Sequence, residues 1–428
     1  MTDTLPLGPA AVDAVRWPDV AALPARTPAN RLRAAAARAL ALRAVAGYPM
    51  RLLLADGTVA GAGGPDAPAL AVHRPEAFFR RIGTGALVGF GESYMAGEWD
   101  TDDLVGVLTV LAAHTADFVP APLQRLRRLC VPRLPAEWHN TLENAPANIR
   151  HHYDLPSELF ALFMDETMAY SSALFPTEPA PGSTTQAQLP AAQHRKIDRL
   201  LDLARVGPGT RLLETGVGWG ELSLRAARRG AHVTAITLSP EQVTHVRRRV
   251  AGAGLTGRVH VELRDYRHVQ GEYDAVVSVE MIEAVGLPRL PLYFAVLERV
   301  LAPGGRIALQ TSSVAHDRML ATRDSHSFMR KYIFPGGALP SPTALQQAAA
   351  RSGLRITGWT RLDAHYAETL RLWRERFTEH RPQIHALGLD ETFCRLWTLY
   401  LAYSEAGFRA GYLHSLQMLI TRNEPRPR

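Results

Sequence analysis

The sequence predicts an α/β protein whose larger part is a Rossmann-like sheet of mostly parallel strands, preceded by a smaller N-terminal α+β domain. Three observations support this prediction. The chain has 428 residues, more than one ordinary domain needs. From about residue 195, strand-like apolar runs alternate with helical stretches, and a glycine-rich turn at 216–220 follows the first strand. We therefore expect an N-terminal domain over 1–120, a linker over 121–147 and the larger domain over 148–428.

The composition indicates a globular protein, since 46% of the residues are hydrophobic and 21% are charged. The two cysteines, Cys130 and Cys394, are far apart, which excludes a thiolate zinc site and a disulfide framework. The N-terminal segment lacks a basic region followed by an apolar one, so no signal peptide is expected. No window approaches the roughly 18 apolar residues of a membrane span. We expect a cytoplasmic protein that at most lies on a membrane surface, with no metal.

The net charge of +7 comes almost entirely from an excess of arginine. Guanidinium groups bind phosphate through a bidentate fork, so this surface suits anionic phospholipids or nucleic acid. An arginine-rich genome explains the same excess equally well. Charge alone therefore does not identify the partner.

The N-terminal region combines a helix with short strands. A helix is expected from Asn30, either lying on a membrane interface or, as its many alanines favour, facing the core. Residues 50–73 suggest hairpin strands separated by Asp-Gly and Gly-Gly turns. The Gly- and aromatic-rich stretch 85–100 closes this region, and residues 119–135 suggest a linker with a short basic helix.

The larger domain shows five strands and three helices in alternation. The expected helices are Glu221–Arg229, Pro240–Val250 and about 290–301. A further strand-like run follows near the C-terminal end, at Leu416–Ile420. The expected parallel strands are Arg211–Glu214, His232–Leu238, Val259–Arg264, Ala275–Val279 and Arg306–Gln310.

The glycine turn is the first candidate ligand site. Gly216, Gly218 and Gly220 occupy alternate positions after the first strand, where they allow a sharp bend and close approach of a ligand. The spacing is E-x-G-x-G-x-G, which is typical of S-adenosylmethionine (SAM)-dependent methyltransferases, and not the G-x-G-x-x-G of dinucleotide-binding proteins. A plain turn is the alternative, but the strand before it and the helix after it favour a cofactor site.

The ends of the second and third strands supply further candidates. Thr237, Leu238 and Gln242 stand where most enzymes of this fold hold the ribose, although Gln242 also fits a capping box begun by Ser239. Asp265 follows the third strand, where a carboxylate commonly meets the adenine amino group; a surface turn is the alternative.

Several segments resemble the cyclopropane-fatty-acyl-phospholipid synthases and mycolic acid cyclopropane synthases. They include YDAVVSVEMIEAVG (273–286), FMRKYIFPGGALPS (328–341) and HYAETLRLWRERF (365–377). The likeness covers roughly residues 80–420. The family's HYD…M-x-YS-x-A pattern is matched at His152, Tyr153, Asp154, Met168, Tyr170, Ser171 and Ala173.

The resemblance implies a class I methyltransferase fold with acyl-binding insertions, SAM as donor and the double bond of an unsaturated membrane phospholipid as acceptor. It implies a protein peripheral to the inner membrane face, a homodimer and no nucleic-acid partner. Glu283 and Tyr366 match positions around a bound bicarbonate, and Tyr153, Tyr332 and Phe334 are candidate walls of the acyl site. The implied SAM contacts are Tyr170, Ser171, Gly216, Gly218, Thr237, Leu238 and Gln242.

The sequence departs from the family around the anion. Ser172, Gln310 and Ser312 replace the usual Cys, His and Ile, and Ala284 replaces a His. In this the chain looks closer to the actinobacterial branch linked to 10-methyl (tuberculostearate-type) acids, in which a flavin-dependent partner reduces a methylene intermediate. We predict the methylene product, with a cyclopropane as the alternative.

Glu283 is expected to orient the base or to act as the base; the alternative is that it only caps its loop. Two other functions compete with this prediction. One is a different methyltransferase of the same fold, and the other is a non-catalytic SAM- or lipid-binding module.

Overall fold

The computed structural model describes residues 12–114 and 155–423. Contacts divide the chain into two compact units. Besides its N-terminal part, the first unit includes residues 324–333 and 377–410, and the second unit contains the remaining described residues. The expected boundaries near 120 and 148, the linker and Tyr153 lie outside the described residues, so the predicted domain limits stay predictions.

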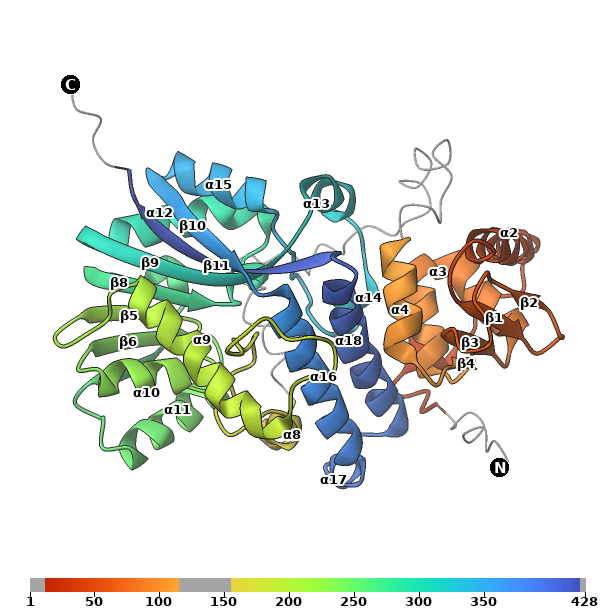
Figure 1. Cartoon of the computed structure of the whole chain (residues 1–428), viewed down its shortest axis with the longest axis horizontal. Coiled ribbons are helices and arrows are strands. Elements are labelled where there is room, and N and C mark those ends of the chain that lie inside the picture. The colour runs from red at the N-terminus through yellow and green to blue at the C-terminus, as the bar shows by residue number, and fades with distance from the viewer. Residues whose placement is uncertain (1–11, 115–154, 424–428) are drawn as a thin grey trace. The chain divides into compact units, whose positions relative to one another are not determined.

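The first unit contains a small four-stranded sheet and several helices (Figure 1). The expected hairpin is formed by β1 (Arg51–Leu54) and β2 (Val59–Ala60), and β1 also pairs in parallel with β3 (Ala69–Val72). The stretch expected to close this region is mostly helical and leads into β4 (Trp99–Asp100). The helices are α1 (Pro18–Ala21), α2 (Pro28–Val45), α3 (Pro75–Met95), α4 (Leu104–Ala113), α14 (Phe328–Tyr332), α17 (Arg381–Ala386) and α18 (Glu391–Arg409).

Glycines of α3 allow close packing in this unit. A Cβ at Gly83 would come within 2.7 Å of the backbone of Arg33 on α2, and one at Gly91 would lie 2.2 Å from the ring of Phe328 on α14. The helix α2 thus packs on α3, although Val45 is its one fully buried residue. The predicted helix is confirmed, but its contact with the core is limited to a narrow stripe.

The second unit is built on a seven-stranded sheet, whose labelled strands are drawn one below another in Figure 1. The strands lie in the order β10-β11-β9-β8-β5-β6-β7. The five strands from β9 to β7 are parallel, whereas β11 runs antiparallel to both of its neighbours. Their bounds are β5 (Arg211–Thr215), β6 (His232–Thr237), β7 (Val259–Leu263), β8 (Tyr273–Val279), β9 (Leu301–Val314), β10 (Leu354–Arg361) and β11 (Leu413–Arg422).

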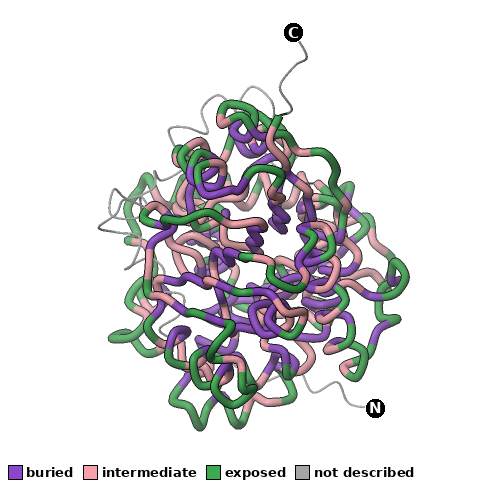
Figure 2. The backbone as a smooth tube through the Cα atoms, turned by 90° about the vertical axis from the view of Figure 1, so that its left-hand side faces the viewer, coloured by how far each residue is buried: buried purple, intermediate pink, exposed green. Residues whose placement is uncertain are grey.

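Helices cover both faces of this sheet. One face packs against α9 (Leu189–Leu203), α10 (Glu221–Arg228) and α11 (Pro240–Gly252), and the other against α12 (Leu290–Val300) and α15 (Pro342–Arg351). Neighbouring residues Leu212 and Leu213 of β5 belong to different buried clusters, because side chains alternate along a strand. Figure 2 shows buried backbone inside and exposed residues at the outer turns.

The predicted parallel strands and their connecting helices are confirmed, as is the α/β class. The sequence underestimated β9, which begins at Leu301, because Pro303, Gly304 and Gly305 interrupt the apolar run that marks a strand. The remaining helices of this unit are α8 (Ser157–Phe163), α13 (His316–Thr322) and α16 (Asp363–Glu379). Within the described ranges, every helix is too short or too polar to cross a membrane.

The close contact at Gly91 provides a test of the first unit. Gly91→Ala places a methyl group against the Phe328 ring, so the ring or the helix must shift, and we expect a loss of about 1–3 kcal/mol in the free energy of unfolding. Denaturant titration measures it. Gly85→Ala is the matched control on α3, since its Cβ would meet its nearest neighbour only at 4.0 Å. Equal stability of the two variants would contradict the packing.

Candidate active site

A pocket opens at the carboxyl ends of β5, β6 and β8, where α/β sheets commonly bind ligands. The loop after β5 contributes Gly216, Gly218 and Gly220, all with positive φ. A Cβ at Gly220 would lie 2.7 Å from Val246 of α11, so this glycine is required by packing. A Cβ at Gly218 would meet nothing within 4 Å, so this glycine borders free space.

The end of β6 and the start of α11 form a second wall. Ser239 caps α11, as predicted, by accepting a hydrogen bond from the backbone N–H of Gln242 (3.2 Å). The Gln242 side chain does not complete a capping box; its Oε1 accepts from the Thr237 hydroxyl at 2.7 Å. Both side chains line the pocket and fix each other there.

The end of β7 supplies Asp265 and Tyr266. Although burial acts in the opposite sense, hydrogen bonds from Arg267 hold the pKa of Asp265 below its ordinary value. The Asp265 carboxylate is therefore charged and already paired. The buried Tyr266 hydroxyl has no hydrogen-bond partner among the described residues, and Tyr266 lines the pocket.

Buried charges surround one end of the pocket. Lys196 of α9 donates from Nζ to Ser171 Oγ at 2.5 Å, and burial lowers its pKa to about 8 although carboxylates lie nearby. Glu214 at the end of β5 accepts from the Ser223 hydroxyl, and burial raises its pKa to about 8. Both residues line the pocket, where their protonation states change close to neutral pH.

The best-connected group at the site is Glu280, the residue after β8. Its Oε2 accepts from the Tyr366 hydroxyl (2.6 Å), and its Oε1 accepts from Gln310 Nε2 (2.8 Å) and the Ser172 backbone N–H (3.1 Å). Burial raises the pKa of Glu280, while these donors and the charge of Lys196 act against the rise. Three donors favour the ionised form of a carboxylate that faces the pocket.

The backbone at Glu280 is strained, since its φ is 47°. A non-glycine residue in this region costs roughly 1–3 kcal/mol, and such residues cluster at functional sites. The conformation is held by the Glu280 N–H, which donates to the Gln310 carbonyl at 2.8 Å. Met168 also has a positive φ and also lines the pocket.

Glu283 lies close to Glu280 but has different partners. Its Oε1 accepts from Thr311 Oγ1 (2.8 Å) and the Ser312 N–H (2.6 Å), and its buried Oε2 has no partner within residues 12–114 and 155–423. Burial and the charge of Glu280 raise the pKa of Glu283 to about 8. Both pKa values are raised, and repulsion between the two carboxyls favours the proton on Glu283, which has fewer donors, over Glu280.

The segment before α9 is fastened to α16. The N–H of Ala173 donates to Thr369 Oγ1 at 3.1 Å, and the N–H of Phe175 donates to His365 Nδ1 at 3.1 Å. Tyr170 stacks on Trp373 with ring centroids 5.3 Å apart. The same helix supplies Tyr366, so α16 positions the residues beside Glu280.

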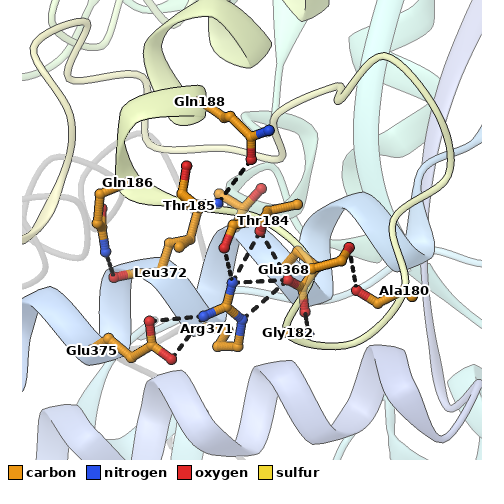
Figure 3. A network of polar contacts seen from close by, with 12 residues as sticks. Ala180, Gly182, Thr184, Thr185, Gln186, Gln188, Glu368, Arg371, Leu372 and Glu375 are labelled. Carbon is orange, nitrogen blue, oxygen red and sulfur yellow. Dashed lines mark hydrogen bonds and ion pairs between the residues drawn. The ribbon is translucent and has the colours of Figure 1, made fainter.

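Farther along, Glu368 and Arg371 of α16 hold the loop 180–188 (Figure 3). Glu368 accepts from the Gly182 N–H (2.9 Å) and Thr184 Oγ1 (2.8 Å), and Arg371 donates to the Thr184 carbonyl at 2.6 Å. Although burial acts in the opposite sense, hydrogen bonds from Arg371, Gly182 and Thr184 lower the pKa of Glu368 to about 2.

The structure brings most of the predicted site residues together. Tyr332 and Phe334 are not among the residues that line the pocket, and the Tyr332 hydroxyl donates to Glu92 at 2.8 Å within the first unit. The predicted catalytic residues also lie outside the lining, namely Glu283, Tyr366, Ser172, Gln310 and Ser312. All eight predicted cofactor residues line the pocket, namely Tyr170, Ser171, Gly216, Gly218, Thr237, Leu238, Gln242 and Asp265.

One grouping differs from the expectation. Ser172, Gln310 and Tyr366 meet Glu280, whereas Glu283 meets Thr311 and Ser312. Glu280 was not among the residues predicted from the sequence. A charged residue immediately after a buried strand, at the carboxyl edge of a parallel sheet, was the available signal.

Comparison with known proteins identifies the family. The model of the family described as mycolic acid cyclopropane synthetase matches residues 140–418. The chain belongs to this family. It is 52% identical over 417 residues to the tuberculostearic acid methyltransferase UfaA1 of Mycobacterium tuberculosis, which covers 97% of each chain. It is 32% identical over 361 residues to the cyclopropane-fatty-acyl-phospholipid synthase of Escherichia coli, covering 83% of this chain and 88% of that one.

Solved structures of this family have the same fold. The mycolic acid cyclopropane synthase CmaA1 complexed with SAH and CTAB superposes with a TM-score of 0.58 at 32% identity, over 64% of this chain and 97% of that chain. The cyclopropane synthase MmaA2 from Mycobacterium tuberculosis gives 0.58 at 30% identity, with the same coverage. The fold is that of the class I SAM-dependent methyltransferases.

The contacts of Glu368 and Arg371 with the loop 180–188, which we call the clamp (Figure 3), predict a pH-dependent stability. Because the folded-state pKa of Glu368 is depressed from 4.5 to about 2, its contribution is fully present above pH 4.5 and is lost as the pH falls towards 2. Glu368→Gln should lower stability and speed deuterium exchange at 180–188 at pH 7, with a stability difference from the natural protein that narrows on acidification. Glu375 is half-exposed and pairs with the same Arg371, so Glu375→Gln should change the stability and the exchange rate little. A difference that does not change with pH would contradict this role.

Proposed function

We propose that this enzyme uses SAM to methylate the cis double bond of an unsaturated fatty-acyl chain carried by a phospholipid. Its similarity to a tuberculostearic acid methyltransferase and to a cyclopropane-fatty-acyl-phospholipid synthase supports this substrate class. The observation that carries the proposed chemistry is Glu280, a carboxylate with three donors at the wall of the pocket.

The pocket fits SAM. Gly218 leaves space for close approach of a ligand, and among the described residues the Tyr266 hydroxyl has no hydrogen-bond partner and the Lys196 ammonium donates to Ser171. Thr237, Leu238 and Gln242 would hold the ribose, Asp265 the adenine end, and Tyr170 and Ser171 the methionine end. When bound, SAM supplies an electrophilic methyl group on a sulfonium.

The acceptor demands a site that tolerates positive charge. An isolated alkene is a weak nucleophile, and when its π electrons form the new carbon–carbon bond, the neighbouring carbon becomes a cation. Aromatic faces and carboxylates stabilise such a charge. Tyr170, Trp373 and Tyr366 form an aromatic cluster beside Glu280, with Tyr366 edge-on to Trp373 at 6.3 Å.

Glu280 is the proton acceptor in this proposal. Its Oε1 has two donors and its Oε2 has one, so Oε2 keeps a lone pair for an incoming proton. Glu283 is unsuited, because its raised pKa leaves it protonated at neutral pH. This assigns to Glu280 the role that the sequence had suggested for Glu283.

The product we favour is the methylene-branched chain. A hydride moves from the methylated carbon to the cationic one, and the new methyl group then loses a proton to Glu280, which leaves an exocyclic C=CH₂. Without the hydride shift, the same proton loss closes a cyclopropane. A separate flavin-dependent reductase would convert the methylene to a methyl branch.

The phospholipid substrate implies that the enzyme docks on a membrane surface. Formation of a homodimer stays a prediction.

Bound bicarbonate is not needed in this proposal. The donors expected around it, Tyr366, Gln310 and the Ser172 N–H, are already used by the Glu280 side chain. In this proposal the Glu280 carboxylate therefore replaces the bound bicarbonate as the anion that accepts from these donors.

The cofactor assignment is tested at Gly218. Gly218→Ala adds a methyl group that faces the pocket and imposes roughly 1–2 kcal/mol of left-handed strain, so SAM affinity should fall at least tenfold in calorimetry. Gly209→Ala is the matched control, because it has positive φ and open surroundings but lies outside the pocket. It should lose similar stability and keep full affinity. Equal SAM affinity of both variants would remove Gly218 from the cofactor site.

The proton acceptor is tested by Glu280→Gln. This change keeps the shape and removes the charge, so turnover of unsaturated phospholipid should fall by about 10²–10⁴-fold while SAM binding is kept. Product analysis by mass spectrometry gives both rate and branching type. Glu283→Gln should have a much smaller effect, since an amide resembles a protonated carboxyl.

A rescue experiment adds a second check. Glu280→Gly suits the φ of 47° and leaves a space bordered by Tyr366, Gln310 and the Ser172 N–H, so added formate or bicarbonate should restore part of the turnover. Near-normal turnover of Glu280→Gln in a folded protein would rule Glu280 out as the base.

A further inference from the structure

A chain of side-chain hydrogen bonds runs from Glu280 to an arginine on another element. Gln310 Nε2 donates to Glu280 Oε1 at 2.8 Å, Gln417 Nε2 donates to Gln310 Oε1 at 2.9 Å, and Arg199 NH1 donates to Gln417 Oε1 at 2.5 Å. Gln310 and Gln417 are 0% and 1% exposed, so water does not replace these contacts. We call Arg199, Gln417 and Gln310 the relay.

The sheet fixes the order of the relay. Gln417 of β11 lies opposite Gln310 of β9, and Gln310 lies opposite Val279, the residue before Glu280. On the other side, Thr360 of β10 lies opposite Gln417, and its hydroxyl accepts from Arg199 NH2 at 2.6 Å. Arg199 of α9 therefore spans two neighbouring strands, and the glutamines extend its contacts across two more.

Arg199 sets the direction of the bonds in the relay, supported by long contacts at 3.5 Å from the Gln417 and Gln310 NH₂ groups to the carbonyls of Lys196 and Ser172. A guanidinium only donates, so Gln417 must turn its carbonyl towards Arg199 and its NH₂ towards Gln310. Gln310 must then turn its carbonyl towards Gln417 and its NH₂ towards Glu280. As a result Glu280 Oε1 faces a donor, and a proton on that oxygen would meet the NH₂ group head-on.

In the part of the chain that the structure describes, Arg199 pairs with no carboxylate. Within the described residues its hydrogen bonds go to Gln417 and Thr360, and no ion pair involves it. Hydrogen-bonded amides in a low-dielectric interior polarise one another, so a cation at one end strengthens the donor at the other. The titratable groups that face Glu280 directly are Tyr366, Lys196 and Glu283.

We propose that Arg199 is a positioning residue, which acts through Gln417 and Gln310 to hold Glu280 ionised and oriented with Oε2 towards the reacting carbon. The inference rests on the proposed role of Glu280 as proton acceptor. It adds that the base depends on a cation that does not border the pocket.

The experiment compares pH profiles of single-turnover methyl transfer at saturating SAM. Arg199→Met frees the glutamines to reverse, so the acidic limb should move up by about one pH unit or more, with nearly full rate recovered at high pH and unchanged SAM affinity. Arg199→Lys, which keeps a cationic donor, should restore most of the natural profile. Arg228→Met, an exposed arginine of α10 without contact to the relay, is the matched control.

A second variant, Gln417→Glu, tests the relay independently by reversing the orientation of the Gln310 amide. Gln417→Glu offers Arg199 a carboxylate and offers Gln310 only acceptors, so Gln310 must turn its NH₂ away from Glu280 and face it with a carbonyl. The acidic limb should then move further than in Arg199→Met.

The outcomes separate the two proposals. If Glu280→Gln is inactive but Arg199→Met and Gln417→Glu keep the natural pH profile, the relay has no role and the base assignment stands. A uniform rate loss at every pH, or a loss of SAM affinity, shows a merely structural role and also overturns the inference. If Glu280→Gln is active, the base assignment fails, and the inference fails with it.

Discussion

The placement of three hydrogen-bond donors around one carboxylate, in a site largely withdrawn from water, explains much of this structure. An ionised carboxylate in such surroundings is costly unless donors satisfy it. Glu280 obtains its donors from three separate parts of the chain: the segment before α9, strand β9 and helix α16. The clamp on α16 and the register of β9 are therefore part of the site, although neither lies at the pocket wall.

Glu280 and its neighbour Glu283 show how different surroundings give two carboxyl groups different affinities for a proton. Glu280 and Glu283 are three residues apart, and both would be charged in water. Glu280 meets donors on both oxygens, while one oxygen of Glu283 has none. Their mutual repulsion pushes the proton to the group with fewer donors. The pair can thus hold a single negative charge at a defined atom, which is what removal of a specific proton requires.

Local sequence patterns predicted the parallel sheet and the glycine loop that lines the pocket. The glycine spacing, Thr237, Gln242 and Asp265 are close in sequence to the strands that carry them, so the strand ends alone indicate where they lie. Glu280 was missed because its partners Ser172, Gln310 and Tyr366 come from positions 108, 30 and 86 residues away. Its backbone conformation is also unusual for glutamate. The link from Arg199 to Gln417 depends on the pairing of β11 with β9, which no local pattern encodes.

The position of β11 has a consequence for how the protein forms. This strand lies between β9 and β10, but it is synthesised after both, so the earlier strands must wait for it. The residues that line the pocket lie between 167 and 285 and come from elements made long before β11. Late insertion of a strand between distant partners is slow, because the loop-closure entropy is lost before the contacts form. During synthesis the residues that line the pocket are therefore made well before Gln417, which completes the hydrogen-bond chain behind Glu280.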